Sequence, residues 1–252
     1  MDCLSNKRVL VTGGGQGIGR AIVEELLRRG CHVAIHYCTS AEGAQDVKRL
    51  APTEARVECF QANLQDEPAA TDLVARSAAF LGGLDILINN SGDLVGRRTL
   101  EQIDDTFWRK VMDVNLTSLM FVTRAALPHL VAAGQSSIVN IASLAGRMGG
   151  HPGSLVYSTA KGAVLTWTRF LARELGPRGV RVNAVAPGLI LGTRFHQTHT
   201  TAESAAASIA QIPLRRAGTP EDVARAVAFL AAEYDGFITG ATLDINGGVY
   251  GG

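Results

Sequence analysis

Short apolar runs rich in β-branched residues alternate with longer segments of helical period along almost the whole chain. The expected strands are Arg8–Val11, His32–His36, Arg56–Phe60, Leu84–Ile88, Ser137–Ile141, Val180–Val185 and Ala241–Ile245. Apolar residues recur three and four positions apart, as on one face of a helix, in Ile18–Arg29, Ala41–Leu50, Pro68–Leu81, Asp105–Val131, Leu155–Leu175 and Pro220–Ala232. Strands that are apolar throughout are typical of parallel sheets with helical crossovers. The sequence therefore predicts an α/β fold with seven parallel strands and helices on both faces.

One domain over residues 1–252 is the simplest organisation of this pattern. A chain of 252 residues, of which 46% are hydrophobic, could form one large α/β domain or two small ones. The sequence shows no Pro/Ser-rich linker, internal repeat or charge block that would mark a second domain. The stretch Gly188–Arg216 has no clear strand or helix pattern, and we expect a mobile substrate cover at about 189–216.

Charge is balanced and scattered, with 24 Lys and Arg against 23 Asp and Glu. This pattern provides no basic footprint for nucleic acid or anionic lipid, so we expect a small-molecule partner. No run approaches the 18 apolar residues of a membrane span, and Met1–Arg8 lacks the apolar core of a secretory signal. We therefore expect no nucleic-acid partner, no membrane partner and a cytoplasmic location.

No metal site is expected. The four cysteines, Cys3, Cys31, Cys38 and Cys59, have spacings that fit neither a metal site nor a redox pair. We interpret them as free thiols and expect Cys31 and Cys59 in a strand or the core. His196 and His199 lie three apart, but no third ligand accompanies them.

A glycine-rich turn follows the first expected strand, with the sequence VTGGGQGIGRA over residues 11–21. Glycines allow positive φ angles and close approach of a ligand to the backbone, and the next helix offers free N–H groups to a diphosphate. The turn therefore favours a dinucleotide. The literal GxGxxG fingerprint is not met, so on this turn alone a purely structural role stays open.

Tyr157 and Lys161 lie four residues apart on an expected helix and hence on one of its faces. A nearby ammonium would lower the phenol pKa from about 10 toward the range useful for proton transfer. Ser143 follows an expected strand and so lies at the carboxyl edge of the sheet, where open α/β folds bind ligands. By itself each feature also fits a surface pair or a polar strand end.

Taken together, these residues resemble the short-chain dehydrogenase/reductase family. The matching motifs, in order and spacing from residue 8 to about 248, are Thr12-Gly13-x3-Gly17-x-Gly19, Asn89-Asn90-Ser91-Gly92, Asn115, Ser143, Tyr157-x3-Lys161 and Pro187-Gly188. The resemblance implies a Rossmann-like doubly wound domain with strand order 3-2-1-4-5-6-7. It also implies a nicotinamide-dependent oxidoreductase acting reversibly on CH–OH and C=O groups, and a homotetramer built on the two long helices, which carry apolar residues beyond one stripe.

The resemblance assigns site residues position by position. Tyr157 would be the general acid or base, Ser143 would orient the substrate oxygen, Lys161 would lower the tyrosine pKa and hold the ribose, and Asn115 would position a water relay. Ser91 replaces an alanine of the family pattern, a small change. The implied cofactor-binding residues are Gly13, Gln16, Gly17, Ile18, Gly19, Tyr37, Thr39, Ser40, Asn63, Leu64, Asn90, Ser91, Gly92, Tyr157, Lys161, Pro187, Gly188 and Ile190.

Two positions depart from the family pattern. Thr193 stands five residues past Gly188 where the family has its carboxamide-binding threonine four past it, so we do not carry that contact over. Asn63 stands where the family often has an aspartate facing the adenine, and an amide oxygen can accept the same hydrogen bond.

Cofactor choice depends on residues 36–40 at the end of the second strand, which contain no acid to repel an extra phosphate. Glu42 we interpret as part of a capping box with Thr39. NADP(H) is therefore favoured, with Thr39, Ser40 and His36 as candidate phosphate contacts. The same segment has no Arg or Lys, so NAD(H) or dual use stays open.

The substrate class is less defined. By general pattern the chain is similar to 3-oxoacyl-carrier-protein reductases and to sugar or cyclic-alcohol dehydrogenases. An acidic carrier protein needs a basic landing surface, and the loop 131–137 has no Lys or Arg, although Arg169 and Arg173 remain on the helix. We favour a small ketone or secondary alcohol, with 3-oxoacyl-carrier-protein reduction and a non-catalytic dinucleotide-binding protein as alternatives. His151 is a candidate substrate contact or a solvated loop residue.

Overall fold

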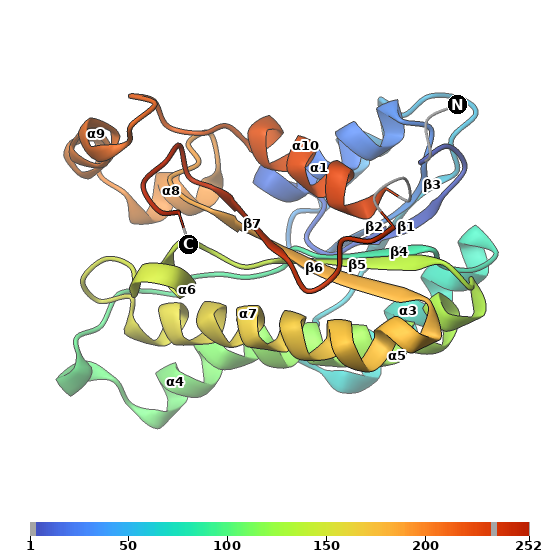
Figure 1. Cartoon of the computed structure of the whole chain (residues 1–252), viewed down its shortest axis with the longest axis horizontal. Helices are drawn as coiled ribbons and strands as arrows, with labels where there is room; N and C mark the ends of the chain where they lie inside the picture. Colours follow the sequence, from blue (N-terminus) through green and yellow to red (C-terminus); the bar gives the residue numbers. More distant parts are fainter. Residues whose placement is uncertain (1–3, 233–235, 252) are drawn as a thin grey trace.

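The computed structural model describes residues 4–232 and 236–251. Seven parallel strands form one sheet in the order β3-β2-β1-β4-β5-β6-β7 (Figure 1). Their bounds are β1 Arg8–Val11, β2 His32–Tyr37, β3 Val57–Gln61, β4 Ile86–Asn89, β5 Ser136–Ile141, β6 Val180–Pro187 and β7 Thr242–Ile245. The predicted fold class, all seven strands and their order are confirmed. Because β1 pairs with both β2 and β4, the chain reverses its direction of winding between β1 and β4, where open α/β sheets place their ligands.

Helices cover both faces of the sheet (Figure 1). The longer ones are α1 Gly17–Arg28, α2 Ala41–Arg49, α3 Glu67–Leu81, α4 Asp105–Met112, α5 Ser118–Ala132, α7 Leu155–Leu175, α9 Ala202–Gln211 and α10 Pro220–Ala231. Alternate residues of β1 enter different cores, with Val9 and Val11 packed toward α1 and α10 and Leu10 packed toward α3 and α5. This is the pleat of a strand buried on both faces, and it explains the apolar runs in the sequence.

The long helix predicted over Asp105–Val131 is interrupted by one wider turn. A π-helical turn, η2, spans Asp113–Thr117 between α4 and α5. Asn115 lies in it, fully buried, and its side-chain amide donates to the carbonyl of Val111 at 2.9 Å. The prediction of helix was right, but its regular continuation was wrong, because the amide of Asn115 takes a carbonyl of the preceding turn. π-Turns often occur at functional sites.

The stretch Gly188–Arg216, for which the sequence predicted neither helix nor strand, contains α8 Arg194–His199 and α9. Each begins with a threonine whose side chain accepts a backbone N–H, Thr193 from His196 and Thr201 from Ser204. Three shorter elements complete the described chain, the turns η1 Leu100–Gln102 and η3 Gly176–Arg178 and the one-turn helix α6 Ala145–Met148.

The capping box predicted from Thr39 and Glu42 was wrong. The residue that precedes α2 is Ser40, and its side chain makes no capping hydrogen bond. Glu42 therefore lies one position too early for the box, in the first turn of the helix, where an acid still complements the helix dipole.

The described cysteines are free thiols, as predicted. Cys31 is buried directly before β2, and Cys59 lies half-buried in β3, where burial raises the pKa of its thiol to about 11. Cys38 is exposed, and Cys3 lies outside the described residues. Within residues 4–232 and 236–251 there is no cluster of three potential metal-binding side chains, and no helix there is long and apolar enough to cross a membrane.

Candidate active site

The glycine turn after β1 is held in place by the segment after β4. The side-chain amide of Asn90 donates to the carbonyls of Thr12 at 2.9 Å and Gly13 at 3.1 Å, and the Thr12 hydroxyl accepts the backbone N–H groups of Asn90 and Ser91. Gly19 has no room for a side chain, since a Cβ there would lie 2.1 Å from the Gly13 carbonyl oxygen. The turn and the Asn89–Gly92 segment therefore form one rigid wall at the carboxyl edge of the sheet.

The N-terminus of α1, which follows this turn, is suited to an anion. Gln16 precedes the helix without a side-chain capping bond, and its first turn carries no acid. Gly17 opens the helix with a φ of 52°, in the left-handed region. Free backbone N–H groups and the positive end of a helix dipole fit a cofactor diphosphate over Gly13 and Gln16–Gly19.

His36 is placed differently from our expectation of a phosphate contact. Its ring is buried under the glycine turn, where Nδ1 accepts the N–H of Gly13 at 3.0 Å and Nε2 donates to the carbonyl of Ala62 at 3.1 Å. Burial lowers the pKa of the ring to about 4. Both nitrogens are used and the ring is neutral, so His36 supports the turn from below and cannot bind a phosphate.

Hydroxyl groups remain at the end of β2. Thr39 is exposed, and Ser40 lies against the glycine turn, since a Cβ on Gly15 would come within 2.6 Å of the Ser40 hydroxyl. Tyr37 is half-buried at the end of the strand and packs on the core. These positions agree with the predicted ribose end of a cofactor site.

Further cofactor candidates line the same edge. Asn63 is exposed after β3, and its side-chain oxygen accepts the N–H of Gln65 at 3.2 Å. Leu64 is buried. Pro187 ends β6, and Ile190 is 2% exposed within the core, which leaves only its backbone for a ligand. Gly188 adjoins them, its N–H paired with the carbonyl of Ile245.

Lys161 is buried at the start of α7 and joins the helix to β5. Its ammonium donates to the carbonyl of Ile141 at 2.8 Å, and burial lowers its pKa to about 8. A Cβ added to Gly92 would lie 3.0 Å from Lys161 Nζ and 2.7 Å from Asn115 Oδ1. Gly92 therefore brings the ends of β4, η2 and α7 together at one point.

Asn115 ties the loop after β4 to η2. Its side-chain nitrogen donates to the backbone carbonyl of Asp93 at 2.7 Å, and its side-chain oxygen accepts the backbone N–H of Asp93 at 3.2 Å. The π-turn is what aims this side chain across the helix at the loop. Beneath it, Asn89 donates to Asn140 at 2.9 Å and to Thr123 at 3.0 Å, which fixes β4 against β5 and α5.

Tyr157 lies one turn before Lys161 on α7, with Lys161 Nζ 5.8 Å from the centre of its ring. Burial raises the pKa of the phenol to about 12, a hydrogen bond with the Ser143 hydroxyl lowers it, and the charge of Asp93 raises it. The expected lowering by Lys161 is not what dominates here, because desolvation of the phenolate outweighs the favourable contacts. Ser143, Tyr157, Lys161 and Asn115 are nevertheless gathered at the carboxyl ends of β4 and β5.

Helix α8 lies across this group. Thr193, before its first residue, packs on the glycine turn, within 3.4 Å of a Cβ on Gly17. Phe195 lies with its ring centre 5.8 Å from that of Tyr157, and His199 Nε2 lies 3.5 Å from the Asp93 carboxylate. The helix thus runs from the diphosphate turn to the loop held by Asn115.

Phe195 and Asp93 lie in segments that the sequence places opposite the nicotinamide, 189–211 and 93–97, but neither was named individually as a site residue. A single aromatic residue in an unpatterned stretch gives no signal in the sequence, and Asp93 could have been found only as the residue that follows the Asn-Asn-Ser-Gly motif. Thr193, whose contact we left unassigned, does reach the glycine turn. Gly192 absorbs the additional residue with a φ of 80°.

The family model described as Enoyl-(Acyl carrier protein) reductase matches residues 13–250. The chain belongs to the short-chain dehydrogenase/reductase family. It is 35% identical to 2-(S)-hydroxypropyl-CoM dehydrogenase 3 of Xanthobacter autotrophicus, over 98% of this chain and 97% of that protein. It is 38% identical to the 3-oxoacyl-[acyl-carrier-protein] reductase FabG of Vibrio cholerae, over 98% of both chains.

Solved structures agree with this assignment. A dehydrogenase/reductase from Sinorhizobium meliloti superposes with a TM-score of 0.89 at 33% identity, covering 98% of this chain and 96% of that one. The NADH-dependent reductase A1-R′, responsible for alginate metabolism, superposes with a TM-score of 0.87 at 32% identity over 99% of both chains. This short-chain dehydrogenase/reductase is therefore an oxidoreductase that acts on CH–OH or C=O groups with a nicotinamide cofactor.

Proposed function

We propose that the protein reversibly reduces the carbonyl of a small ketone, or oxidises the matching secondary alcohol, with Tyr157 as general acid and base. The observation that carries the proposal is the convergence of Tyr157, Ser143, Lys161 and Asn115 at the sheet edge, beside a helix N-terminus suited to a diphosphate. When bound, the nicotinamide supplies or accepts the hydride. The protein's own residues then have to hold the substrate oxygen and move one proton.

Tyr157 transfers the proton. In reduction the phenol donates it to the carbonyl oxygen as that oxygen gains negative charge, and Ser143 offers its hydroxyl to the same oxygen. A pKa of about 12 keeps the phenol protonated near neutrality, which suits this direction. In oxidation the phenolate must accept a proton, and the nearby ammonium of Lys161 favours that anion. Lys161, anchored at Ile141, also points toward Gly92, where a ribose hydroxyl would lie.

Replacing the phenol hydroxyl tests this role. Tyr157→Phe should lower turnover on the order of a hundredfold or more while cofactor binding is kept, because a positioned proton donor contributes about that much. Tyr250→Phe, which removes a hydroxyl from a ring packed on Arg147, is the matched control and should leave turnover unchanged. Turnover above a tenth of the wild-type value in Tyr157→Phe would show that another group transfers the proton.

NADP(H) is the proposed cofactor, with NAD(H) or dual use as the alternative. The end of β2 presents the hydroxyls of Thr39 and Ser40 and no acid. Fluorescence titrations with NADPH and NADH decide between them, and clearly tighter NADH binding would reverse the preference. The similar reductase A1-R′ is NADH-dependent, so the titration discriminates between two real alternatives.

Reduction of a 3-oxoacyl group on a carrier protein is the second candidate, favoured by the similarity to several reductases of that name. A panel of ketones, acyl thioesters and sugars, followed by NAD(P)H absorbance, separates it from a free small substrate. No turnover of any of them would favour a non-catalytic dinucleotide-binding protein. The predicted cytoplasmic location stays a prediction.

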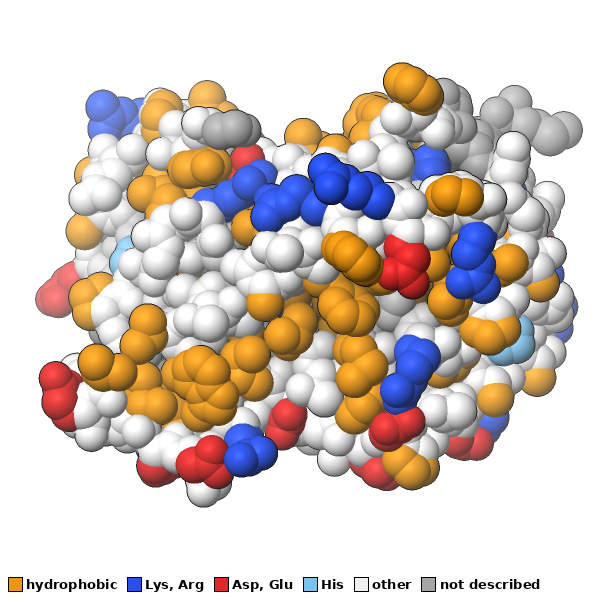
Figure 2. Space-filling model, turned by 60° about the horizontal axis from the view of Figure 1, so that its bottom comes forward, with side chains coloured by type: hydrophobic (Ala, Val, Ile, Leu, Met, Phe, Trp, Pro, Cys, Tyr) orange, Lys and Arg blue, Asp and Glu red, His pale blue; other side chains and the backbone are white. Residues whose placement is uncertain are grey.

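A homotetramer is the proposed assembly. Figure 2 looks onto the face formed by α4, α5 and α7, where apolar side chains gather. On these helices Trp108 and Leu155 are 38% and 46% exposed, and Phe170 is 64% exposed. Large apolar side chains exposed together on one face are typical of a subunit interface. Light scattering of the purified protein measures the assembly directly.

A further inference from the structure

Four basic side chains from three separate segments gather around the helix that lies over Tyr157. We call Arg97, His151, His196 and His199 the basic cluster. Arg97 follows β4, His151 precedes α7, and the other two lie on α8. Burial, followed by the charges of His151, His199 and Arg97, lowers the pKa of His196 to about 4, so its ring is neutral near pH 7. The four side chains therefore share one partly desolvated space, in which Arg97 carries the permanent positive charge.

Phe195 connects this cluster to the catalytic tyrosine. Its ring centre lies 5.8 Å from that of Tyr157, 5.1 Å from that of His196 and 5.3 Å from that of His199. One aromatic ring thus separates the proton donor from two of the basic groups. A substrate whose carbonyl reaches Tyr157 and that extends along Phe195 would bring its other end toward the cluster.

The hydrogen bonds of the cluster leave donors available. His196 Nδ1 pairs with the Thr200 hydroxyl at 2.8 Å, and its Nε2 has no hydrogen-bond partner among the described residues. Arg97 donates to the carbonyls of Pro152 at 3.0 Å and His199 at 3.4 Å, two of the five N–H groups that a guanidinium carries. His151 is exposed at the entrance.

One acid faces this space. Asp93, with its side chain 53% exposed, lies 3.5 Å from His199 Nε2 and balances that histidine when it is protonated. A metal ion does not explain the histidines, since no group of three potential ligands occurs in the described part of the chain. The hydrogen bonds from the Arg97 guanidinium to Pro152 and His199 both end on backbone carbonyls, so they leave its charge unneutralised.

We infer that this enzyme selects substrates that carry an acidic group, such as a carboxylate, close to the reacting carbonyl, and that Arg97 and His196 bind it. The inference rests on the proposed carbonyl reduction and names its substrate class. Arg97 supplies a permanent charge and a forked donor that matches a carboxylate, and His196 gains a proton as the anion arrives. Phe195 covers the carbonyl side of the substrate and keeps water away from it.

Matched substrate pairs test the selection. A short oxo acid such as acetoacetate should have a kcat/KM at least on the order of tenfold higher than its neutral ethyl ester. Arg97→Gln should lower kcat/KM for the acid about thirtyfold and leave the ester nearly unchanged, since a charged hydrogen bond is lost for one substrate only. Arg97→Lys keeps the charge and should recover part of the loss. Arg76→Gln, on the outer surface of α3, is the matched control.

Asp93→Asn and His196→Gln complete the set. Removing the acid should raise the ratio of kcat/KM for the oxo acid to kcat/KM for the ester, and removing His196 should lower that ratio. Equal kcat/KM for acid and ester in the wild type, or an acid preference that survives Arg97→Gln and His196→Gln, would overturn the inference.

A binding measurement keeps the inference testable apart from turnover. Malonate carries carboxylates but no ketone, so calorimetric titration of the holoenzyme with malonate reports the anion site alone. Titrations at pH 6 in two buffers of different ionisation enthalpy should show net proton uptake in the wild type and none in His196→Gln. If malonate does not bind the wild type, the basic cluster is not an anion site. If malonate binds but Tyr157→Phe keeps more than a tenth of the wild-type turnover, the anion site stands and the proposed chemistry is refuted instead.

Discussion

Opposing influences act on the pKa of Tyr157, and under the proposed mechanism their balance decides which direction of the reaction depends on pH. Burial raises the pKa of the phenol to about 12, the hydrogen bond with Ser143 lowers it, and the carboxylate of Asp93 raises it. Below that pKa the phenol is protonated and ready to donate, so reduction should vary little between pH 6 and 8. Oxidation needs the phenolate, whose population rises about tenfold for each pH unit in this range.

Asp93→Asn should move this balance. Loss of the negative charge lowers the tyrosine pKa, so the rising limb of log kcat/KM for alcohol oxidation shifts to lower pH, by on the order of half a unit. Asp93 is more than half exposed, so the difference between wild type and variant should shrink in high salt. A pH profile of oxidation at low and high ionic strength measures both effects.

A shift to higher pH in Asp93→Asn, or a shift that salt does not reduce, would mean that the carboxylate acts through the position of Asn115. The two roles are separable because the bonds to Asn115 come from the backbone of Asp93, which asparagine keeps. His199→Gln is the useful companion variant. It leaves the carboxylate unpaired and should move the profile in the opposite direction from Asp93→Asn.

Motif spacing selected Asn115, Ser143, Tyr157 and Lys161, because their order along the chain is characteristic of the family, and the structure brings the four together while their catalytic roles stay a proposal. Motif spacing was insufficient for His36, whose role depends on which side of β2 the ring faces and on the approach of Gly13 from the turn after β1. Phe195 lies 38 positions beyond Tyr157 in the sequence, and only the folded position of α8 brings their rings together.

At the scale of elements, two local irregularities position the site: the π-turn η2 and the additional residue before Thr193. The π-turn η2 aims Asn115 at the loop after β4, and a sequence pattern with apolar spacings of three and four cannot locate a single wider turn. In the cover, the additional residue before Thr193 is accommodated at Gly192, where the positive φ costs little. Thr193 therefore still reaches Gly17.

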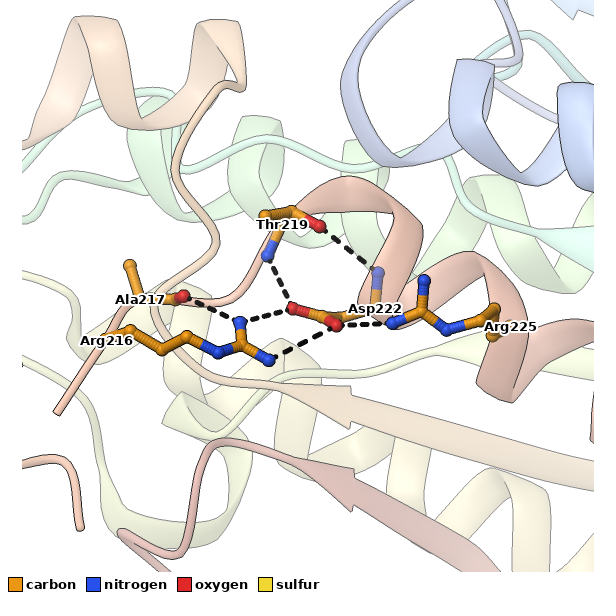
Figure 3. Close-up of polar contacts among 5 residues, drawn as sticks. All are labelled: Arg216, Ala217, Thr219, Asp222 and Arg225. Carbon is orange, nitrogen blue, oxygen red and sulfur yellow. Dashed lines mark hydrogen bonds and ion pairs between the residues drawn. The ribbon is translucent and has the colours of Figure 1, made fainter. Parts of the chain in front are cut away.

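The cover ends at an ion-pair network that begins α10 (Figure 3). Asp222 accepts the backbone N–H of Thr219 at 3.0 Å and pairs with Arg216 at 2.7 Å and Arg225 at 2.6 Å. These contacts, the hydrogen bond with Arg216 first, lower the pKa of the carboxyl to about 2. Arg216 is the last residue of the expected cover, so the network fastens that segment to the helix.

Asp222→Asn should destabilise the protein by about 1–2 kcal/mol, a value reduced from the full pKa shift because both arginines are more than half exposed. For a chain of this length the melting temperature should fall by about 4 °C. The stabilisation is present above the unfolded carboxyl pKa and is lost as pH falls through about 2. The difference measured by thermal unfolding should thus be constant between pH 5 and 8.

Arg225→Gln and Arg216→Gln separate the stability that Asp222 gives to α10 from the stability that it gives to the cover, residues 189–216. Loss of Arg225, a partner on α10 itself, should affect only stability. Loss of Arg216 should also speed proteolysis within 189–216, because that residue alone links the cover to Asp222. Unchanged proteolysis would show that α8 and α9 are held by their other contacts.

At the scale of the whole molecule, the sheet is closed on both faces by helices, and hydrophobic periodicity alone revealed that arrangement. Periodicity did not supply the strand order, which came from the family resemblance, because all seven strands read alike. What the periodicity could not show is where polar groups are buried inside this closed structure. His36 is one of them, and it links the stability of the fold to pH and to the cofactor turn.

Acid should therefore destabilise the fold before its carboxylates are titrated. The folded protein holds His36 neutral with a pKa of about 4, whereas an unfolded histidine has a pKa of about 6.5. Between these values the unfolded chain binds more protons, so stability falls as pH falls from 6.5 to 4. From pH 7.5 to 5 the loss due to His36 should be about 2 kcal/mol in urea unfolding.

His36→Asn isolates this contribution, because an asparagine can accept the N–H of Gly13 without a titrating ring. The variant should be somewhat less stable than the wild type at pH 7.5, where the imidazole makes both of its hydrogen bonds. At pH 5 the difference in the free energy of unfolding should vanish or change sign. Only in the wild type does the unfolded chain gain a proton at position 36 that the folded protein excludes. Parallel pH dependences for the two proteins would mean that water reaches His36, and the glycine turn would then lack the dry support that holds it ready for a diphosphate.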